Sequence, residues 1–217
     1  MAGDRPKRPF SVWGVIYLLL AAFSIYGLVT AVKGDEEKAG FTGRIGVFFI
    51  LSCLANIGWI FAWHYQVVPL SLVLMLVLLG CLITIYLRLN IGRSDATAAE
   101  KYLVHMPFSV YMGWITIATI ANVTALLVDI GWNGFGLSDQ FWTVAVIIVG
   151  IAITAAVLIT RRDVYYSLVV VWAFLGILIK RMSDATVPDQ AVVFAAVAGM
   201  ALIAAGIITQ LVRRTAY

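Results

Sequence analysis

Two asparagines lie in very apolar stretches at helical spacing from tryptophans, and they are the side chains best suited to binding chemistry. Asn56 is followed by Trp59, and Trp114 is followed by Asn122. An amide without partners in hydrocarbon costs roughly 2 to 7 kcal/mol, so each asparagine is expected to face protein. Indole rings are large and rigid, and each carries an N–H that needs an acceptor. This combination predicts an aromatic-lined pocket inside a helical bundle.

Three stripes of such residues recur along the chain, each at spacings that place its members on one helix face. The stripes are Phe10, Trp13 and Tyr17; Asn56, Trp59 and Trp63; and Tyr111, Trp114, Ala118 and Asn122. The small side chain of Ala118 would leave space between larger neighbours. Ordinary helix–helix interfaces would produce the same stripes, so the pocket is a hypothesis.

The composition indicates the environment in which these helices fold. The chain has 217 residues, of which 63% are apolar and 12% are charged, and its mean hydropathy is +1.00. Soluble domains have about 45–50% apolar and about 25% charged residues. Seven apolar runs are long enough to cross a bilayer, at 10–32, 44–65, 69–90, 107–129, 139–160, 164–180 and 190–212. We therefore predict an all-α, polytopic membrane bundle of about seven transmembrane helices, with the lipid bilayer as its surroundings.

The basic residues lie almost entirely in loops and tails, which favours charge flanking membrane helices over nucleic-acid binding, despite a pI of about 9.2. One side of the membrane would hold Lys33, Lys38, Arg44, Arg88, Arg93, Lys101, Arg161, Arg162, Arg213 and Arg214. The other side would hold Arg5, Lys7, Arg8, Lys180 and Arg181. Because cytoplasmic loops carry the excess of Lys and Arg, we expect an N-terminus outside and a C-terminus inside, in a cell (plasma) membrane.

The connections between the runs are mostly short. His64–Pro69 and Arg161–Asp163 predict tight turns, whereas Asn90–His105 is long enough to hold a short interfacial helix. Pro107 is expected at the start of the fourth spanning helix, where no amide hydrogen bond is lost. Asp129–Gly136 predicts a folded surface turn. The surrounding aromatic residues are typical of an interfacial belt: Trp132, Phe135, Phe141 and Trp142.

The ordered set of these motifs resembles the TspO/MBR family of tryptophan-rich sensory proteins, also called translocator proteins. The motifs are Trp13-x-x-x-Tyr17, Asn56-x-x-Trp59, and Pro107 followed by Trp114-x-x-x-Ala118-x-x-x-Asn122, and the resemblance covers residues 8–130. It implies a small helical membrane protein, often a homodimer, with a sensory or regulatory role. It also implies a pocket that binds porphyrins, haem-like tetrapyrroles and other flat hydrophobic ligands.

The resemblance also assigns individual positions to that pocket. By their match to the motifs, the residues that would line or brace it are Trp13, Tyr17, Asn56, Trp59, Trp114, Ala118 and Asn122. Trp63 and Tyr111 join them through helical spacing alone. The family has five helices, so we expect a TspO-like four-helix membrane core in residues 1–136 and three additional transmembrane helices, packed on that core, in residues 137–217.

Other functions are compatible with parts of the sequence. The chain could be an accessory or structural membrane subunit, or a facilitator of apolar-solute movement. No Asp, Glu, Lys or Arg lies in the middle of a predicted span, which argues against charge-coupled transport. Cys53 and Cys81 lack metal-ligand spacing, and His64 and His105 are expected on opposite membrane faces. No motif of a standard enzyme stands out, so we predict neither catalytic nor metal-binding residues.

Overall fold

The computed structural model describes residues 12–34, 36–183 and 189–215, and the elements within these ranges are all helical. They are α1 (Val12–Val32), α2 (Glu36–His64), α3 (Val68–Arg88), α4 (Ala98–Glu100), a π-helix (Lys101–His105), α5 (Met106–Asp129), a 3-10 helix (Gly134–Gly136), α6 (Asp139–Arg161), α7 (Val164–Ser183) and α8 (Gln190–Thr215). Within the described chain, seven helical segments are long and apolar enough to span a membrane, which confirms the predicted fold class. Arg5, Lys7, Arg8 and Phe10 lie outside the described residues, as do the side chains of Lys38, Arg213 and Arg214.

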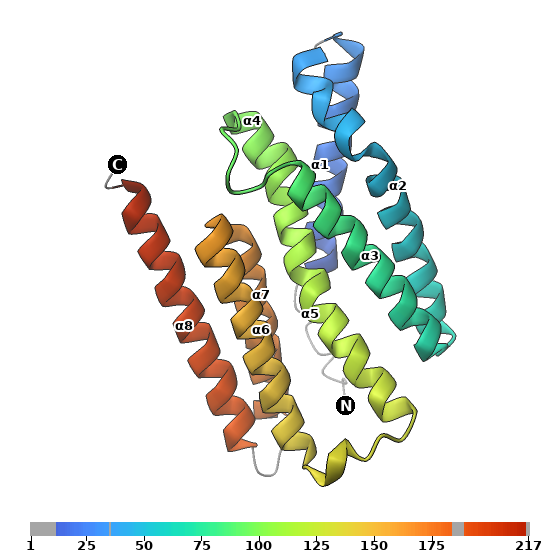
Figure 1. The fold of residues 1–217 in the computed structure, drawn as a ribbon, viewed down its shortest axis with the longest axis vertical. Coiled ribbons are helices and arrows are strands. Elements are labelled where there is room, and N and C mark those ends of the chain that lie inside the picture. The colour runs from blue at the N-terminus through green and yellow to red at the C-terminus, as the bar shows by residue number, and fades with distance from the viewer. Residues whose placement is uncertain (1–11, 35, 184–188, 216–217) are drawn as a thin grey trace, which may run out of the picture.

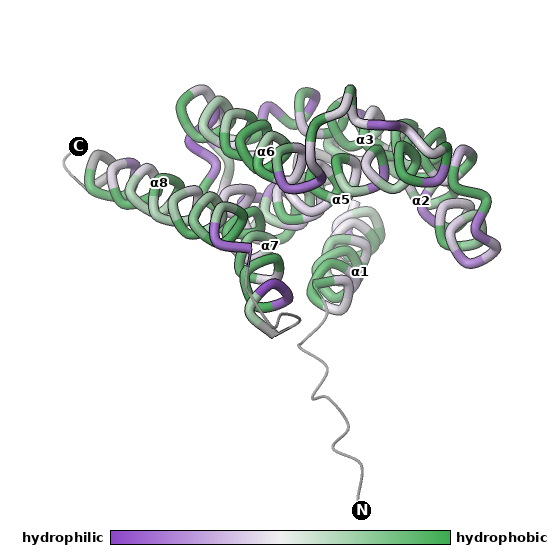
Figure 2. The backbone as a smooth tube through the Cα atoms, turned by 90° about the horizontal axis from the view of Figure 1, so that it is seen from below, coloured by the Kyte–Doolittle hydropathy of each residue, from purple (hydrophilic) through white to green (hydrophobic). Residues whose placement is uncertain are grey.

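Helix α5 lies at the centre of the bundle (Figure 1). It contacts α1 and α3 as well as α6 and α7, while α2 packs on α3 and α8 packs on α6 and α7. Hydrophobic residues cover most of each helix, and the hydrophilic residues gather in the connections (Figure 2). The bundle therefore has two groups of helices, and α5 joins them.

Both predicted tight turns are confirmed. Between α2 and α3, the Val67 N–H donates to the Ala62 carbonyl at 2.8 Å, and Gln66 adopts a left-handed conformation with φ of 56°. Between α6 and α7, Arg162 is likewise left-handed, with φ of 54°. A single left-handed residue reverses the chain after a helix, so α2–α3 and α6–α7 are antiparallel hairpins.

The start of the fourth spanning helix differs from the prediction. It begins at Ala98 instead of 107, and the expected short interfacial helix forms its first turns. Thr97 and Glu100 form a capping box, which satisfies backbone N–H groups that a helix start leaves unpaired. Pro107 has no N–H to donate within a helix, and just before it the chain widens into a π-helix whose Met106 N–H bonds to the Lys101 carbonyl. The helix therefore passes through Pro107.

The predicted surface turn after α5 is folded around its aromatic residues. The ring centroids of Trp132 and Trp142 are 4.8 Å apart, and Phe135 and Phe141 both lie against Trp142. The indole N–H of Trp142 donates to the Gly134 carbonyl at 2.9 Å. The four rings thus form one cluster at the α5–α6 connection, and their role as an interfacial belt stays a prediction.

A glycine permits the contact between α5 and α7. A Cβ atom on Gly113 would lie 2.9 Å from the carbonyl oxygen of Tyr166 and 3.3 Å from its Cα. In lipid, helices associate through close packing because burial away from water does not drive them together. Gly113 therefore sets the distance at which α7 docks on α5.

We predict that Gly113→Ala destabilises the protein, because the added methyl group meets backbone that cannot rotate away. Overpacking of this kind costs about 1–3 kcal/mol, and thermal unfolding in detergent measures it. Gly80→Ala is the matched control, because a Cβ on this glycine of α3 would have no atom within 4 Å. A Gly113→Ala melting temperature equal to or above those of the wild type and of Gly80→Ala would contradict the close approach.

Candidate functional site

Five aromatic side chains from three helices meet in the membrane-spanning region, and we call them the aromatic cluster. They are Trp13 and Tyr17 of α1, Trp59 and Trp63 of α2, and Trp114 of α5. Trp13 is at its centre: its ring stacks on Trp59 at 5.6 Å and meets Trp114 edge-on at 6.2 Å. These separations are in the range of favourable aromatic pairs. The structure thus brings together members of all three predicted stripes.

Asn56 belongs to the same site. It is 7% exposed, and its amide nitrogen donates to the Tyr17 hydroxyl at 3.3 Å, which joins α2 to α1. Tyr17 and Trp63 are 45% and 46% exposed, so the cluster reaches the side surface of the bundle. The site is therefore accessible from the bilayer.

Three polar atoms of the site are buried without a hydrogen-bond partner among the described residues. They are the amide oxygen of Asn56 and the indole nitrogens of Trp59 and Trp114. A buried donor or acceptor left unpaired costs about 1–3 kcal/mol. Two donors and one acceptor of the site are thus buried without a partner among the described residues.

A cavity of about 600 Å³ adjoins the cluster at Trp63. It lies between the α2–α3 turn and the last turns of α5, and Gln66, Thr124 and Asp129 contribute its polar groups. Its volume is in the range of small-molecule sites. A molecule too large for the cluster itself has space here.

The second asparagine has different contacts from the first. The amide oxygen of Asn122 accepts a hydrogen bond from the Ser71 hydroxyl at 3.0 Å, and both residues are buried. Asn122 lies eight residues beyond Trp114, which is about 12 Å along the helix axis. It braces α5 against α3, and its partner Ser71 was not among the residues that the sequence singled out.

Tyr111 and Ala118 occupy the expected face of α5 on either side of Trp114. Tyr111 is 2% exposed and belongs to the apolar core, against which Ala118 packs while partly buried. Their helix face is as predicted, and their contact with a ligand stays a prediction.

Taken together, the seven spanning helices and the tryptophan cluster between α1, α2 and α5 define an integral membrane protein of the tryptophan-rich helical type. The family model described as "TSPO-like protein" matches residues 7–209. The chain therefore belongs to the TSPO-like protein family. The match extends well beyond residues 8–130, where the motifs lie, and reaches into α8.

No curated protein and no solved structure matched the chain. The division into a core of residues 1–136 and three added helices stays a prediction.

We predict that Asn122→Ala lowers the free energy of unfolding, because it removes the bond to Ser71. Double-mutant cycles on membrane helices give about 0.6 kcal/mol for such a bond, with a maximum of about 1.7. A cycle with Ser71→Ala, measured by unfolding in mixed micelles, isolates the pair. A coupling energy of zero would show that Asn122 does not brace α3.

Proposed function

We propose that the protein binds a flat hydrophobic ligand, most simply a porphyrin or haem-like tetrapyrrole, at the aromatic cluster. The observation that carries this proposal is the set of three unpartnered polar atoms on Asn56, Trp59 and Trp114. A flat ligand with acceptor groups at its edge would accept from the two indole N–H groups. A donor on the same ligand would satisfy the Asn56 oxygen. The stacked indole rings would supply the apolar contact area.

The ligand has to enter between helices. Trp13 and Trp59 have ring centroids 5.6 Å apart. A ligand ring stacked between them would need the two indole rings to be about 7 Å apart. Helix α1 has only three buried residues, Ile16, Phe23 and Thr30. Because so little of α1 is buried, it is the helix best able to move outward and let a planar molecule stack on Trp59.

Family membership supports a sensory or regulatory role for this binding, in which ligand occupancy changes the position of α1. A receptor of this kind needs a ligand-dependent structural change, and the exposed edges of Tyr17 and Trp63 give the ligand a path from the bilayer. The homodimer and the plasma-membrane location are further parts of this proposal, and they rest on the resemblance and on the charge pattern.

We predict that protoporphyrin IX binds saturably and that Trp59→Phe and Trp114→Phe each weaken binding about five- to tenfold. Each substitution keeps an aromatic ring but removes an N–H, and one hydrogen bond is worth about 1 kcal/mol. Titration of the detergent-solubilised protein, followed by porphyrin absorbance and tryptophan quenching, measures the affinity.

Trp172→Phe is the matched control, because it also removes one tryptophan but from a half-exposed position on α7. This control should leave the affinity for protoporphyrin IX unchanged. Asn56→Leu should weaken the binding of ligands that carry a donor group. Equal binding by wild type and all variants would rule out the aromatic cluster as the site.

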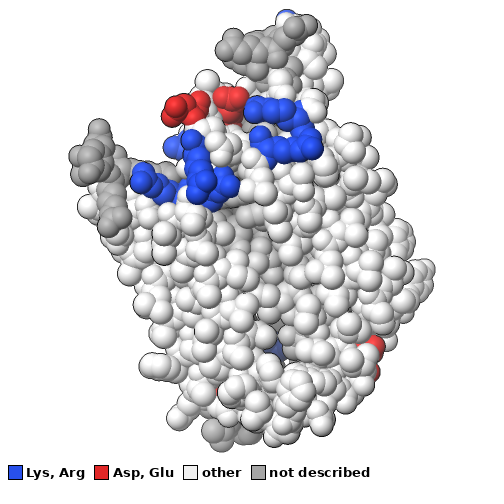
Figure 3. Space-filling model, in the orientation of Figure 1, with Lys and Arg blue, Asp and Glu red and all other residues white. Residues whose placement is uncertain are grey.

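The orientation proposed from the charges has a separate test. The α3–α4 and α6–α7 connections lie at the same end of the bundle, where Lys and Arg gather (Figure 3). We predict that this end is cytoplasmic. In a chain with Cys53 and Cys81 replaced by alanine, a membrane-impermeant maleimide should label Leu137→Cys in intact cells. Ala99→Cys should react only after the cells are opened, and the reverse pattern would invert the topology.

A further inference from the structure

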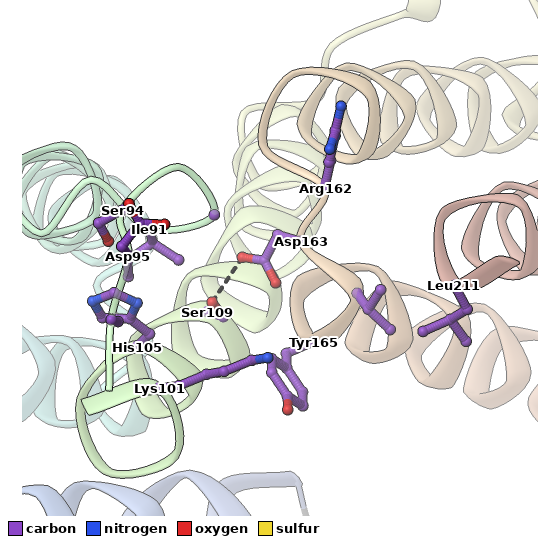
Figure 4. Close-up of a pocket in the computed structure, with 13 residues that line it drawn as sticks. Ile91, Ser94, Asp95, Lys101, His105, Ser109, Arg162, Asp163, Tyr165 and Leu211 are labelled. Carbon is purple, nitrogen blue, oxygen red and sulfur yellow. Dashed lines mark hydrogen bonds between the residues drawn. The ribbon is translucent and has the colours of Figure 1, made fainter. Parts of the chain in front are cut away.

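A second cavity of about 650 Å³ lies where the α3–α4 connection, the π-helix, α5 and the start of α7 meet (Figure 4). Its polar wall includes Ser94, Asp95, Lys101, His105, Ser109 and Asp163, and Arg162 and Tyr165 line it as well. Ser109 and Trp114 are five residues apart on α5, so they lie on different faces of that helix. The cavity is therefore separate from the aromatic cluster.

Asp163 is the buried charged group of this cavity. It is 5% exposed, and one carboxylate oxygen accepts from the hydroxyls of Tyr86 at 2.8 Å and Ser109 at 2.7 Å. The other oxygen accepts from the Tyr166 backbone N–H at 3.1 Å. Among the described residues its carboxylate is held by these hydrogen bonds and forms no ion pair. A buried carboxylate favours a cationic partner, and the second oxygen has a lone pair left for a further donor.

Charged side chains of both signs line the cavity beside Asp163, because Lys101 and Arg162 are positive and Asp95 is negative. Lys101 is exposed and extends from the π-helix toward Tyr165, while Arg162 points away from Asp163 (Figure 4). A simple cation bound at Asp163 would be repelled by Lys101. A molecule with a positive group inside and a negative group outside would satisfy both residues.

The π-helix that precedes Pro107 also borders this cavity. π-Helical turns are rare and are frequently found at functional sites. The π-helix Lys101–His105 begins and ends with the two residues that it contributes to the cavity wall.

We propose that this cavity binds a small zwitterion whose primary ammonium group lies close to a phosphate, as in an aminoethyl phosphate group. The ammonium donates to Asp163, and the phosphate interacts with Lys101. The same group exists free as phosphoethanolamine and as the head of phosphatidylethanolamine, and the volume of about 650 Å³ suits either. This site is independent of tetrapyrrole binding.

Two probes on the full-length protein separate these sources. Calorimetric titration of delipidated protein with phosphoethanolamine tests the free zwitterion. Melting temperatures with added phosphatidylethanolamine or phosphatidylcholine test the lipid, because choline has no N–H to donate. We expect saturable binding of phosphoethanolamine, selective stabilisation by phosphatidylethanolamine, or both. No binding of phosphoethanolamine, together with equal or no stabilisation by the two lipids, would overturn the proposal.

Two variants test the contacts. Asp163→Asn should weaken binding tenfold or more, whereas Asp139→Asn, an exposed acid at the start of α6, should not change it. Lys101→Ala should weaken the binding of phosphoethanolamine tenfold, because the phosphate contact is lost, and should strengthen the binding of ethylamine, because the repulsion is lost. This variant remains informative if Asp163→Asn fails to fold. Unchanged phosphoethanolamine binding by Lys101→Ala would show that the proposal is wrong.

Discussion

The bundle depends on the buried carboxylate of Asp163, to which three helices contribute hydrogen bonds. Tyr86 donates from α3, Ser109 from α5, and the Tyr166 backbone from the first turn of α7. In a bilayer the lipid tails are as apolar as the helix surfaces, so packing and polar contacts determine which helices associate. Asp163 therefore joins α3 and α5 to the α6–α7 hairpin. Removing its carboxylate oxygens would leave the buried hydroxyls of Tyr86 and Ser109 unpaired.

The same constraint explains why two similar asparagines have different hydrogen-bond partners. Asn122 lies opposite a serine, and its bond to Ser71 stabilises the α3–α5 contact. Asn56 lies among indole rings. Its amide nitrogen donates to the Tyr17 hydroxyl, but its amide oxygen has no partner among the described residues. An unpaired group in apolar surroundings lowers stability, and such groups tend to persist where they serve binding. The facing helix thus decides whether the amide oxygen of each asparagine has a hydrogen-bond partner.

Hydropathy and length predict the spanning helices because a bilayer requires long apolar segments with internally paired backbones. The tight turns at His64–Pro69 and Arg161–Asp163 follow from the short connections between apolar runs, which are a local signal. Ser71 and Asp163 could not be assigned in this way. Serine is common in apolar helices, and an aspartate after two arginines is typical of a solvated turn. Their burial depends on how α3, α5 and α7 pack, which no local pattern contains.

Helix α5 shows how one segment serves both regions of the bundle. Tyr111, Trp114 and Ala118 form its aromatic face, with Trp114 against Trp13 of α1. Ser109 and Gly113, four residues apart, form a second face, where the hydroxyl bonds to Asp163 and the missing side chain admits Tyr166. The aromatic face stood out in the sequence because tryptophan is large and rare. The second face consists of small residues, which allow helices to approach closely without leaving a strong pattern. A bulky ring and a missing side chain therefore both shape the packing of α5, although only the ring is conspicuous in the sequence.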